Sequence, residues 1–341
     1  MRSGLEKWLL EHWYSSQIPP WYLRVLEPLY RSAFKHARKR QLARSNINQS
    51  KLPLIVVGNI TAGGSGKTPL VIRLCQLAQE MNLQPGIAST GYGRQSKETI
   101  QVNADSDTSE CGDEPVLLAQ RTGAPVVVAV SRADAVSSLN EMDLDLVISD
   151  DGLQHIDLGA DIEICVVDGQ RGMGNGHLIP AGPLREPVER LHSVDHLVTN
   201  GDWHDKPAGL SANLMQLEPV VVKPLSNGDG CSMDEFIEIY AAFNIHAVAG
   251  IGNPQRFFSM LQSLGFDLQA HAFADHHNYT PQDFAAFADG SIILMTEKDA
   301  VKCRALGLKN AWYVEVEARL HVEFERILKH EIKNLIEDRE T

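Results

Sequence analysis

The chain has 341 residues, of which 43% are apolar and 22% charged, and this is the composition of a globular protein long enough for two ordinary domains. Its five cysteines are odd in number and form no CxxC pair, so the sequence predicts neither a disulfide framework nor a thiolate metal site, and a reducing cytoplasm suits it best. The net charge of −13 is unevenly spread, because residues 1–45 carry nine Lys and Arg against three Glu and form a separate basic segment.

The first predicted element is an amphipathic helix within residues 1–45. Apolar residues recur at helical spacing from Trp21 to Phe34, while most of the basic residues fall on other sides of the helix. Aromatic rings beside cations suit a lipid interface, and the alternative is a helix packed on the protein's own core. The basic charge of the segment and the Lys39-Arg40 pair favour the membrane surface.

This segment is not expected to cross a membrane. Glu6 and Glu11 interrupt its early apolar residues, so it does not resemble a secretory signal. The uncharged run from His12 to Leu23 contains two prolines and is shorter than the about 20 apolar residues of a spanning helix. We expect a peripheral or monotopic association with a membrane.

From Leu52 onward, short apolar and β-branched runs alternate with helical stretches, which is typical of a doubly wound parallel sheet. The runs are LPLIVVG, PVVVAV, LDLVISDD and IEICVVDG. After Leu217, two prolines and a glycine-rich turn in EPVVVKPLSNGDG predict a linker. A second series of runs then predicts a smaller α/β domain: IHAVAGIGNP, FDLQAHAFAD, SIILMTEKD and AWYVEVEAR. We expect a basic segment at 1–45, a first domain at 46–217, a linker at 218–232 and a C-terminal α/β domain at 233–341.

The segment GNITAGGSGKTP, residues 58–69, lies between a predicted strand and a predicted amphipathic helix, as a phosphate-binding P-loop does. The pattern GxxxxGK[ST] requires a glycine at position 61, where this chain has Thr61, but the later glycines allow successive N–H groups to face phosphate oxygens. The alternative is a turn that binds nothing. The residues predicted to bind nucleotide are Thr61, Ala62, Gly63, Gly64, Ser65, Gly66, Lys67 and Thr68. Lys67 would reach the β and γ phosphates, and the Thr68 hydroxyl would bind Mg²⁺.

A P-loop needs a carboxylate on a neighbouring strand to hold Mg²⁺, and the predicted strand LDLVISDD ends in Asp150 and Asp151. Two acids at a strand end can instead cap a helix. The phosphate loop upstream favours the metal site, and His155 in the same turn adds a polar group. The fold expected is therefore an α/β P-loop NTPase-type sheet with a second, smaller α/β domain.

Three further stretches are rich in polar residues: CGDEP at 111–115, GNGHLIPAGPLREP at 174–187 and FADHHNY at 273–279. Each can be explained as a cap, a rigid loop or a polar turn. Phosphoryl transfer to a hydroxyl, however, requires a base for its proton and a cation to balance charge, and Asp113, His276 and Arg185 are such groups. That these three side chains lie close together in the folded protein is a hypothesis, because their separation along the sequence does not show it.

Six motifs in order along the chain resemble the tetraacyldisaccharide 4′-kinase family: GNITAGGSGKTP, GDEP, DDGLQH, PAGPLREP, DHHNY and TEKDAVK. The resemblance covers nearly the whole chain, and the family's Ser or Thr before its double glycine explains Thr61. It implies transfer of the γ-phosphate of ATP to the 4′-hydroxyl of a tetraacyldisaccharide 1-phosphate in lipid A biosynthesis. It also implies two α/β domains and an N-terminal helix on the cytoplasmic face of the bacterial inner membrane.

The resemblance assigns roles to single residues. Lys67 and Thr68 would serve the phosphates and metal, and Asp150 with Asp151 the Mg²⁺ site. Asp113 and His276 would form a dyad in which Asp113 orients His276 and His276 takes the acceptor's proton. His277 stands beside His276, so the choice between them rests on the DH motif. The residues that would line the site are Gln154, His155, Arg185 and Glu186. No nucleic acid and no obligate protein partner are expected.

Two functions compete with a lipid kinase. A P-loop switch or assembly GTPase usually carries [NT]KxD after a strand, and TEKD at Thr296 has glutamate in place of the lysine. A soluble small-molecule kinase leaves the aromatic and basic N-terminal segment unexplained. An oxidoreductase is disfavoured because no GxGxxG follows a strand with an acid at the expected distance.

Overall fold

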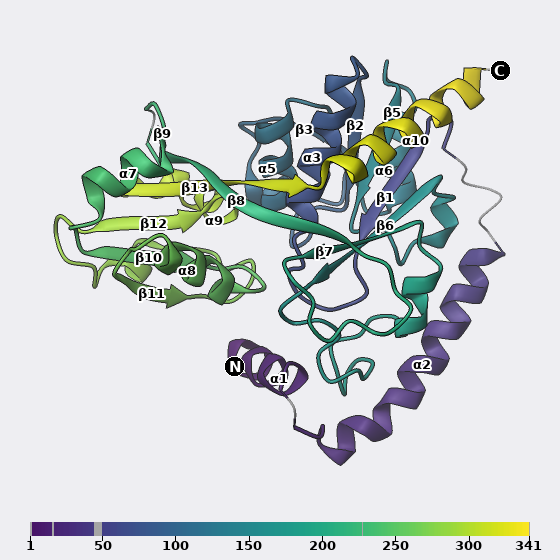
Figure 1. Cartoon of the computed structure of the whole chain (residues 1–341), viewed down its shortest axis with the longest axis horizontal. Helices are drawn as coiled ribbons and strands as arrows, with labels where there is room; N and C mark the ends of the chain where they lie inside the picture. Colours follow the sequence, from purple (N-terminus) through teal and green to yellow (C-terminus); the bar gives the residue numbers. More distant parts are fainter. Residues whose placement is uncertain (1, 16, 44–49, 227, 341) are drawn as a thin grey trace.

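The structure, a computed structural model, describes residues 2–15, 17–43, 50–226 and 228–340. These residues form two lobes that share one continuous mixed sheet, and two helices precede the first lobe. In Figure 1 the first lobe lies on the right and the second on the left, with β8 and β13 running between them.

The first lobe contains seven neighbouring strands in the order β7-β6-β1-β5-β2-β4-β3, all parallel except β3. Their bounds are β1 Leu54–Gly58, β2 Pro85–Ser89, β3 Ile100–Val102, β4 Val126–Val128, β5 Leu146–Asp150, β6 Ile162–Asp168 and β7 His196–Asn200. Every residue of β1, β2, β4 and β5 is buried, as expected for a parallel sheet covered on both faces. The apolar runs that predict this sheet form β1, β4, β5 and β6.

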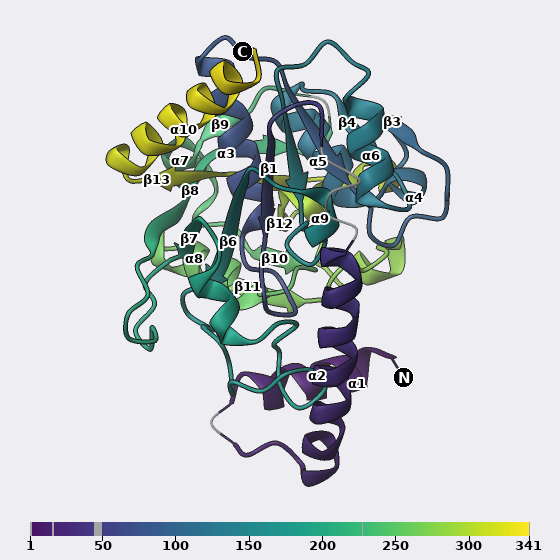
Figure 2. The same ribbon diagram turned by 90° about the vertical axis from the view of Figure 1, so that its right-hand side faces the viewer.

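Helices cover both faces of the first-lobe strands. Their bounds are α3 Lys67–Glu80, α4 Thr108–Cys111, α5 Asp113–Thr122, α6 Arg132–Leu139, η1 Ile156–Leu158 and η2 Val188–His192. The predicted helical stripe Leu70, Leu74 and Leu77 of α3 is buried in one core, and α6 contributes to the core on the opposite face. Figure 2 shows α3 and α6 on opposite sides of these strands.

The second lobe is built on the parallel order β11-β10-β12-β13. Its bounds are α7 Met233–Tyr240, β10 Ile245–Ala249, α8 Pro254–Ser263, β11 Leu268–Ala272, η3 Pro281–Phe284, β12 Ile292–Thr296, α9 Glu297–Cys303, η4 Arg304–Leu306 and β13 Ala311–Leu320. Helices α7 and α8 pack over one face, and α9 with η3 over the other. The four apolar runs of the second series form these four strands.

Two long strands connect the lobes. Strand β8, Asn213–Pro224, pairs in parallel with β7 and antiparallel with β13 from Met215 to Pro224. Residues 218–232, for which the sequence predicts a linker, therefore contain the second half of β8 and the short strand β9, Cys231–Ser232. The part of β8 in this stretch pairs with β13, and this pairing makes the sheet continuous.

The last helix, α10 at Val322–Glu340, returns to the first lobe. Although the sequence places residues 233–341 in one C-terminal domain, α10 packs on α3, and its Phe324, Leu328 and Ile332 are buried in the first-lobe core. Because β13 runs antiparallel to β8, its end carries the chain back to that lobe.

Two helices precede the sheet, α1 at Arg2–Trp13 and α2 at Trp21–Leu42. None of the residues of α2 is buried, and Figures 1 and 2 both show it extending past the first lobe. Trp21 is 74% exposed, Val25 62% and Leu29 66%, so these apolar residues are not part of the protein's core. Among the described helices, none combines the length and apolarity required to span a membrane.

Candidate active site between the two lobes

The glycine-rich loop connects β1 to α3. Gly63 and Gly66 have left-handed φ values of 103° and 98°, and a Cβ atom at Gly66 would collide with the Asn200 side chain. Asn200 Nδ2 donates to the Ser65 carbonyl at 3.1 Å, and the Tyr14 hydroxyl donates to the Ala62 carbonyl at 2.9 Å. The loop is therefore held by Asn200 of β7 and by Tyr14, the residue that follows α1, and Lys67 and Thr68 lie in the first turn of α3.

Two neighbouring acids follow β5 and have different surroundings. Asp150 ends the strand and is buried, and Asp151 follows with a left-handed φ of 52°. Lys67 Nζ lies 3.3 Å from Asp151 Oδ1, and Arg185 Nη1 lies 3.1 Å from Asp151 Oδ2. Burial opposes the ionised form of Asp151, but these two cations hold its pKa below the usual range. Burial, together with the charges of Glu114 and Asp151, raises the pKa of Asp150 to about 7.

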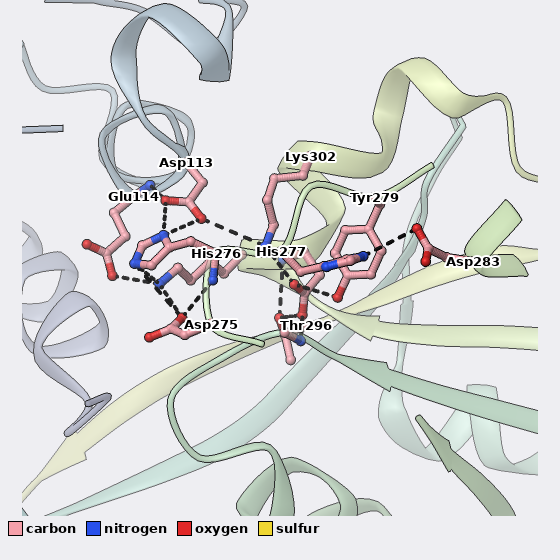
Figure 3. A network of polar contacts seen from close by, with 12 residues as sticks. Asp113, Glu114, Asp275, His276, His277, Tyr279, Asp283, Thr296 and Lys302 are labelled. Carbon is pink, nitrogen blue, oxygen red and sulfur yellow. Dashed lines mark hydrogen bonds and ion pairs between the residues drawn. The ribbon is translucent and has the colours of Figure 1, made fainter. Parts of the chain in front are cut away.

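Asp113 and His276 come from different lobes and meet in the structure (Figure 3). Asp113 begins α5 and is 6% exposed, and His276 lies in the loop after β11 with a left-handed φ of 57°. His276 Nδ1 lies 3.0 Å from Asp113 Oδ2 and 3.1 Å from Oδ1. Burial opposes ionisation of both groups, but their mutual hydrogen bond lowers the pKa of Asp113 to about 2 and helps to raise the pKa of His276.

The structure distinguishes the two adjacent histidines. His277 Nε2 lies 3.3 Å from Asp283 Oδ2, and its ring packs against Phe273 and Tyr279. Figure 3 shows His277 directed towards Asp283, away from Asp113. Of the two, His276 is therefore the one that contacts Asp113.

Lys298 is a site residue that the sequence reasoning did not assign. It lies in the first turn of α9, where the Thr296 hydroxyl accepts the N–H of Asp299 and caps the helix. Lys298 Nζ lies 3.0 Å from Glu114 Oε1, 3.2 Å from Asp275 Oδ1 and 3.3 Å from His276 Nε2. The polar sequence TEKD directly after an apolar strand could have indicated that Lys298 belongs to a site. The residues that Lys298 contacts, however, lie in other segments of the chain.

Among the remaining predicted residues, Gln154 and Glu186 belong to a second polar group. Gln154 Nε2 donates to Glu186 Oε1 and to the Asn59 carbonyl, each at 2.8 Å. Glu186 is buried and lies 3.2 Å from Arg38 of α2, and burial raises its pKa. His155 is partly buried, and its pKa is lowered mainly by burial. Among the described residues, Arg185 lines the main cavity, while Gln154, His155 and Glu186 do not.

A cavity of about 1440 Å³ lies between the lobes. Its lining includes the glycine-rich loop, Asp150 and Asp151 from the first lobe, and His276 and Lys298 from the second. Asp113 does not line it. Leu9, Leu10 and Trp13 of α1 add an apolar portion. Because single small ligands usually occupy about 300–1,000 Å³, this cavity has room for a nucleotide and a second substrate.

Comparison with known proteins gives consistent matches. A profile of the family described as tetraacyldisaccharide-1-P 4′-kinase matches residues 19–333. A tetraacyldisaccharide 4′-kinase of Azotobacter vinelandii is 43% identical over 313 residues, which are 91% of this chain and 92% of that protein. One from Hahella chejuensis is 49% identical over 274 residues, covering 80% of this chain and 79% of that protein.

A solved structure shows a similar arrangement. The crystal structure of LpxK from Aquifex aeolicus in complex with ATP superposes with a TM-score of 0.74 at 27% sequence identity. The match covers 92% of this chain and 99% of the other. The similarity therefore includes both lobes.

Proposed function

The chain belongs to the tetraacyldisaccharide-1-P 4′-kinase family, and we propose the following roles for its residues in the reaction. The protein is an ATP-dependent kinase of lipid A biosynthesis that phosphorylates the 4′-hydroxyl of tetraacyldisaccharide 1-phosphate, which confirms the family and activity expected from the sequence. One observation carries the assignment of its site: a single cavity is lined by Lys67, Asp151 and His276, which come from both lobes.

Residues 61–68 form the phosphate-binding loop of a P-loop NTPase-type lobe in this proposal. Gly63 and Gly66 adopt the left-handed conformations that let loop N–H groups face one ligand, and the loop leads into the N-terminus of α3. Lys67, now paired with Asp151 at 3.3 Å, would instead contact the β and γ phosphates of ATP.

The donor set near this loop fits Mg²⁺. Asp150 Oδ1 is buried and has no hydrogen-bond partner in the described part of the chain, Asp151 is ionised, and Thr68 lines the same cavity. Mg²⁺ prefers such hard oxygen ligands and commonly uses one or two carboxylates together with substrate phosphates. When bound by Thr68, Asp150 and Asp151, the ion would supply positive charge next to the phosphates.

The Asp113–His276 dyad is the proposed acceptor of the hydroxyl proton. His276 lines the cavity, and Asp113 holds its Nδ1 from behind at 3.0 Å. Nε2 is then the imidazole nitrogen that faces the acceptor. Arg185, which also lines the cavity, would balance negative charge on the transferring group. Gln154 would support Arg185 from outside the cavity, since its Oε1 accepts from Arg185 Nη1 at 3.5 Å, and Glu186 would in turn hold Gln154.

The acceptor is a lipid, and we propose that the protein reaches it from the cytoplasmic surface of the inner membrane as a peripheral or monotopic protein. The exposed apolar residues at the start of α2 would enter the lipid interface, and its basic residues would meet anionic headgroups. The apolar residues Leu9, Leu10 and Trp13 in the cavity lining are suited to acyl chains.

The proposal is tested by incubating the protein with γ-labelled ATP, Mg²⁺ and detergent-dispersed tetraacyldisaccharide 1-phosphate. We expect label in the lipid, and we expect Lys67→Ala to lower kcat by on the order of 10²-fold because phosphate stabilisation is lost. Lys51→Ala is a matched control, because Lys51 forms an exposed surface pair with Glu141.

The alternative outcomes identify the competing functions. Nucleotide hydrolysis without labelled lipid would favour a P-loop GTPase or a soluble small-molecule kinase. Unchanged turnover in purified Lys67→Ala would remove this lysine from the mechanism while leaving the reaction itself established.

A further inference from the structure

We propose that Lys298 is a positioning residue for the transfer reaction: by donating to Nε2, its ammonium selects the tautomer of neutral His276 that carries its proton on Nδ1 and its lone pair on Nε2. This inference rests on the proposed role of the dyad. Lys298 would act as a third residue beside Asp113 and His276. It comes from α9, and no other residue of the TEKD motif has a role in the proposed reaction.

The contacts of His276 require one tautomer when the ring is neutral. A neutral imidazole has one N–H donor and one acceptor nitrogen, and an ammonium group can only donate. Nδ1 faces the ionised carboxylate of Asp113 at 3.0 Å, so Nδ1 donates. Nε2 faces Lys298 Nζ at 3.3 Å, so Nε2 accepts. The arrangement therefore leaves the lone pair on the nitrogen proposed to receive the acceptor's proton.

Lys298 is held in place independently of His276. Glu114 of α5 lies 3.0 Å from Nζ and Asp275 lies 3.2 Å from it, and the lysine side chain is largely buried. When an acceptor hydroxyl takes the hydrogen bond to Nε2, the ammonium retains these two carboxylate partners. The cation thus remains beside the ring throughout proton transfer.

Several charged groups surround the ring and act in opposite directions. Asp113 and Glu114 lie on α5, Lys298 and Lys302 on α9, and Asp275 precedes His276 in its own loop; the Tyr92 ring packs 4.9 Å away. Burial lowers the pKa of His276, the Asp113 hydrogen bond raises it, and the Lys298 charge lowers it, with a net increase. Among these groups Lys298 is the one that donates to Nε2.

The test compares Lys298→Met, Lys298→Arg and Lys309→Met. Lys309 is an exposed lysine of the same lobe and serves as the control. For Lys298→Met we expect kcat to fall by on the order of 10-fold to 10²-fold, with the KM values for ATP and lipid little changed. The acid limb of the kcat–pH profile should move to higher pH, because removing a neighbouring positive charge favours protonated His276. Lys298→Arg should keep the acid limb near its wild-type position and restore part of kcat.

A second readout does not depend on turnover. In protein with ¹⁵N-labelled histidine, the ring nitrogens of His276, assigned with His276→Gln, should show a protonated Nδ1 and an unprotonated Nε2 in the neutral form. In Lys298→Met the ring should take up its second proton at higher pH than in the wild type. Circular dichroism would verify that each variant is folded.

Three results would overturn the proposal. They are an unchanged His276 titration, a KM effect with normal kcat, which would make Lys298 a substrate ligand, and a loss of kcat with an unmoved acid limb that Arg does not rescue. Normal activity of Lys298→Met in a working wild-type assay would overturn it as well, and would leave the roles of Asp113 and His276 in place. A wild-type protein that labels no lipid would instead refute the proposed function, and the nitrogen titration would still decide whether Lys298 controls His276.

Discussion

Asp150 and Asp151 are neighbours in the chain, yet the pKa values of their carboxyl groups are shifted in opposite directions. Asp150 is enclosed at the end of β5 and its pKa is raised to about 7, mainly by burial, whereas Lys67 and Arg185 keep the pKa of Asp151 low. A partner also sets the pKa of Asp113 in the dyad. Burial opposes its ionisation, but the hydrogen bond that His276 donates lowers its pKa. The protonation state of each carboxyl group is therefore set by its burial and by the charges that the fold places beside it.

The dyad gives a directional pH prediction. Asp113→Asn removes the carboxylate that raises the pKa of His276, so the acid limb of the kcat–pH profile should move to lower pH. This shift is opposite to that expected for Lys298→Met. The plateau value of kcat should fall by on the order of 10²-fold because the base loses its orienting partner. Steady-state kinetics across the pH range measures both effects.

Asp283→Asn is the matched control, because Asp283 lies 3.3 Å from the neighbouring His277. It should leave the acid limb in place. If Asp283→Asn shifts the limb and Asp113→Asn does not, His277 is the base and our assignment of His276 is wrong.

At the scale of elements, helices α5 and α9 join the lobes through complementary charges. Glu114 meets Lys298 at 3.0 Å, and Arg121 forms an ion pair with Glu297 in which both side chains are largely buried. Because Asp113 begins α5 and Lys298 lies in the first turn of α9, the same helix contact that joins the lobes also places Lys298 beside the Asp113–His276 dyad.

Breaking the Arg121–Glu297 pair should destabilise the fold. Arg121→Ala leaves Glu297 buried without its cation, so we expect the free energy of unfolding to fall by about 3 kcal/mol. Urea unfolding followed by circular dichroism provides the measurement, and Arg121→Met combined with Glu297→Met should recover part of the loss.

The exposed pair Lys51–Glu141 provides the comparison, since removing it should cost under about 1 kcal/mol. Equal losses for Arg121→Ala and Lys51→Ala would show that the α5–α9 pair does not stabilise the contact between the lobes.

At the scale of the whole molecule, the lobes meet on more than one side of the cavity. One contact between the lobes is that of Asp113 with His276. A second, separate contact is the ion pair between Asp168 of β6 and Arg256 of α8, whose Nη2 lies 2.6 Å from Asp168 Oδ1. Arg171 also donates to the carbonyl of Gly252, whose backbone lies against Gly64 of the phosphate loop. The second lobe thus supplies the proposed base, His276, and also contacts the proposed nucleotide loop.

Helix α2 connects this assembly to the proposed membrane surface. Its Tyr30 hydroxyl donates to the Arg185 carbonyl at 2.9 Å, and its Arg38 pairs with Glu186. The side of α2 that makes these contacts faces the first lobe, while Trp21, Val25 and Leu29 are exposed. The helix is therefore available to lipid without losing its contacts to the site.

Replacing Trp21, Val25 and Leu29 together by Ser should reduce co-sedimentation with anionic vesicles several-fold, because the apolar contribution to membrane binding is lost. Activity on detergent-dispersed lipid should persist, since none of the three residues lines the cavity. High salt should weaken binding of the wild type by screening the basic residues. Val322→Ser, at an exposed residue of α10, is the control, and equal vesicle binding by all three proteins would contradict the membrane proposal.

The features that depend on neighbouring residues in the chain could be predicted from the sequence. Apolar β-branched runs predicted strands because such runs bury both faces of a parallel sheet, and Lys67 with Thr68 followed a glycine-rich turn within one continuous segment. The ordered motifs also identified the family. A strand, a turn and a helix start are local, so their residue spacing carries the information needed.

The contacts between side chains that are distant in the sequence became known from the three-dimensional fold. Asp113 and His276 are separated by 163 positions, and Lys298 reaches Glu114 across 184. These contacts depend on the sheet order and on the antiparallel pairing of β8 with β13, which also returns α10 to the first lobe. Local patterns do not encode that order, because it follows from the packing of all strands and helices at once.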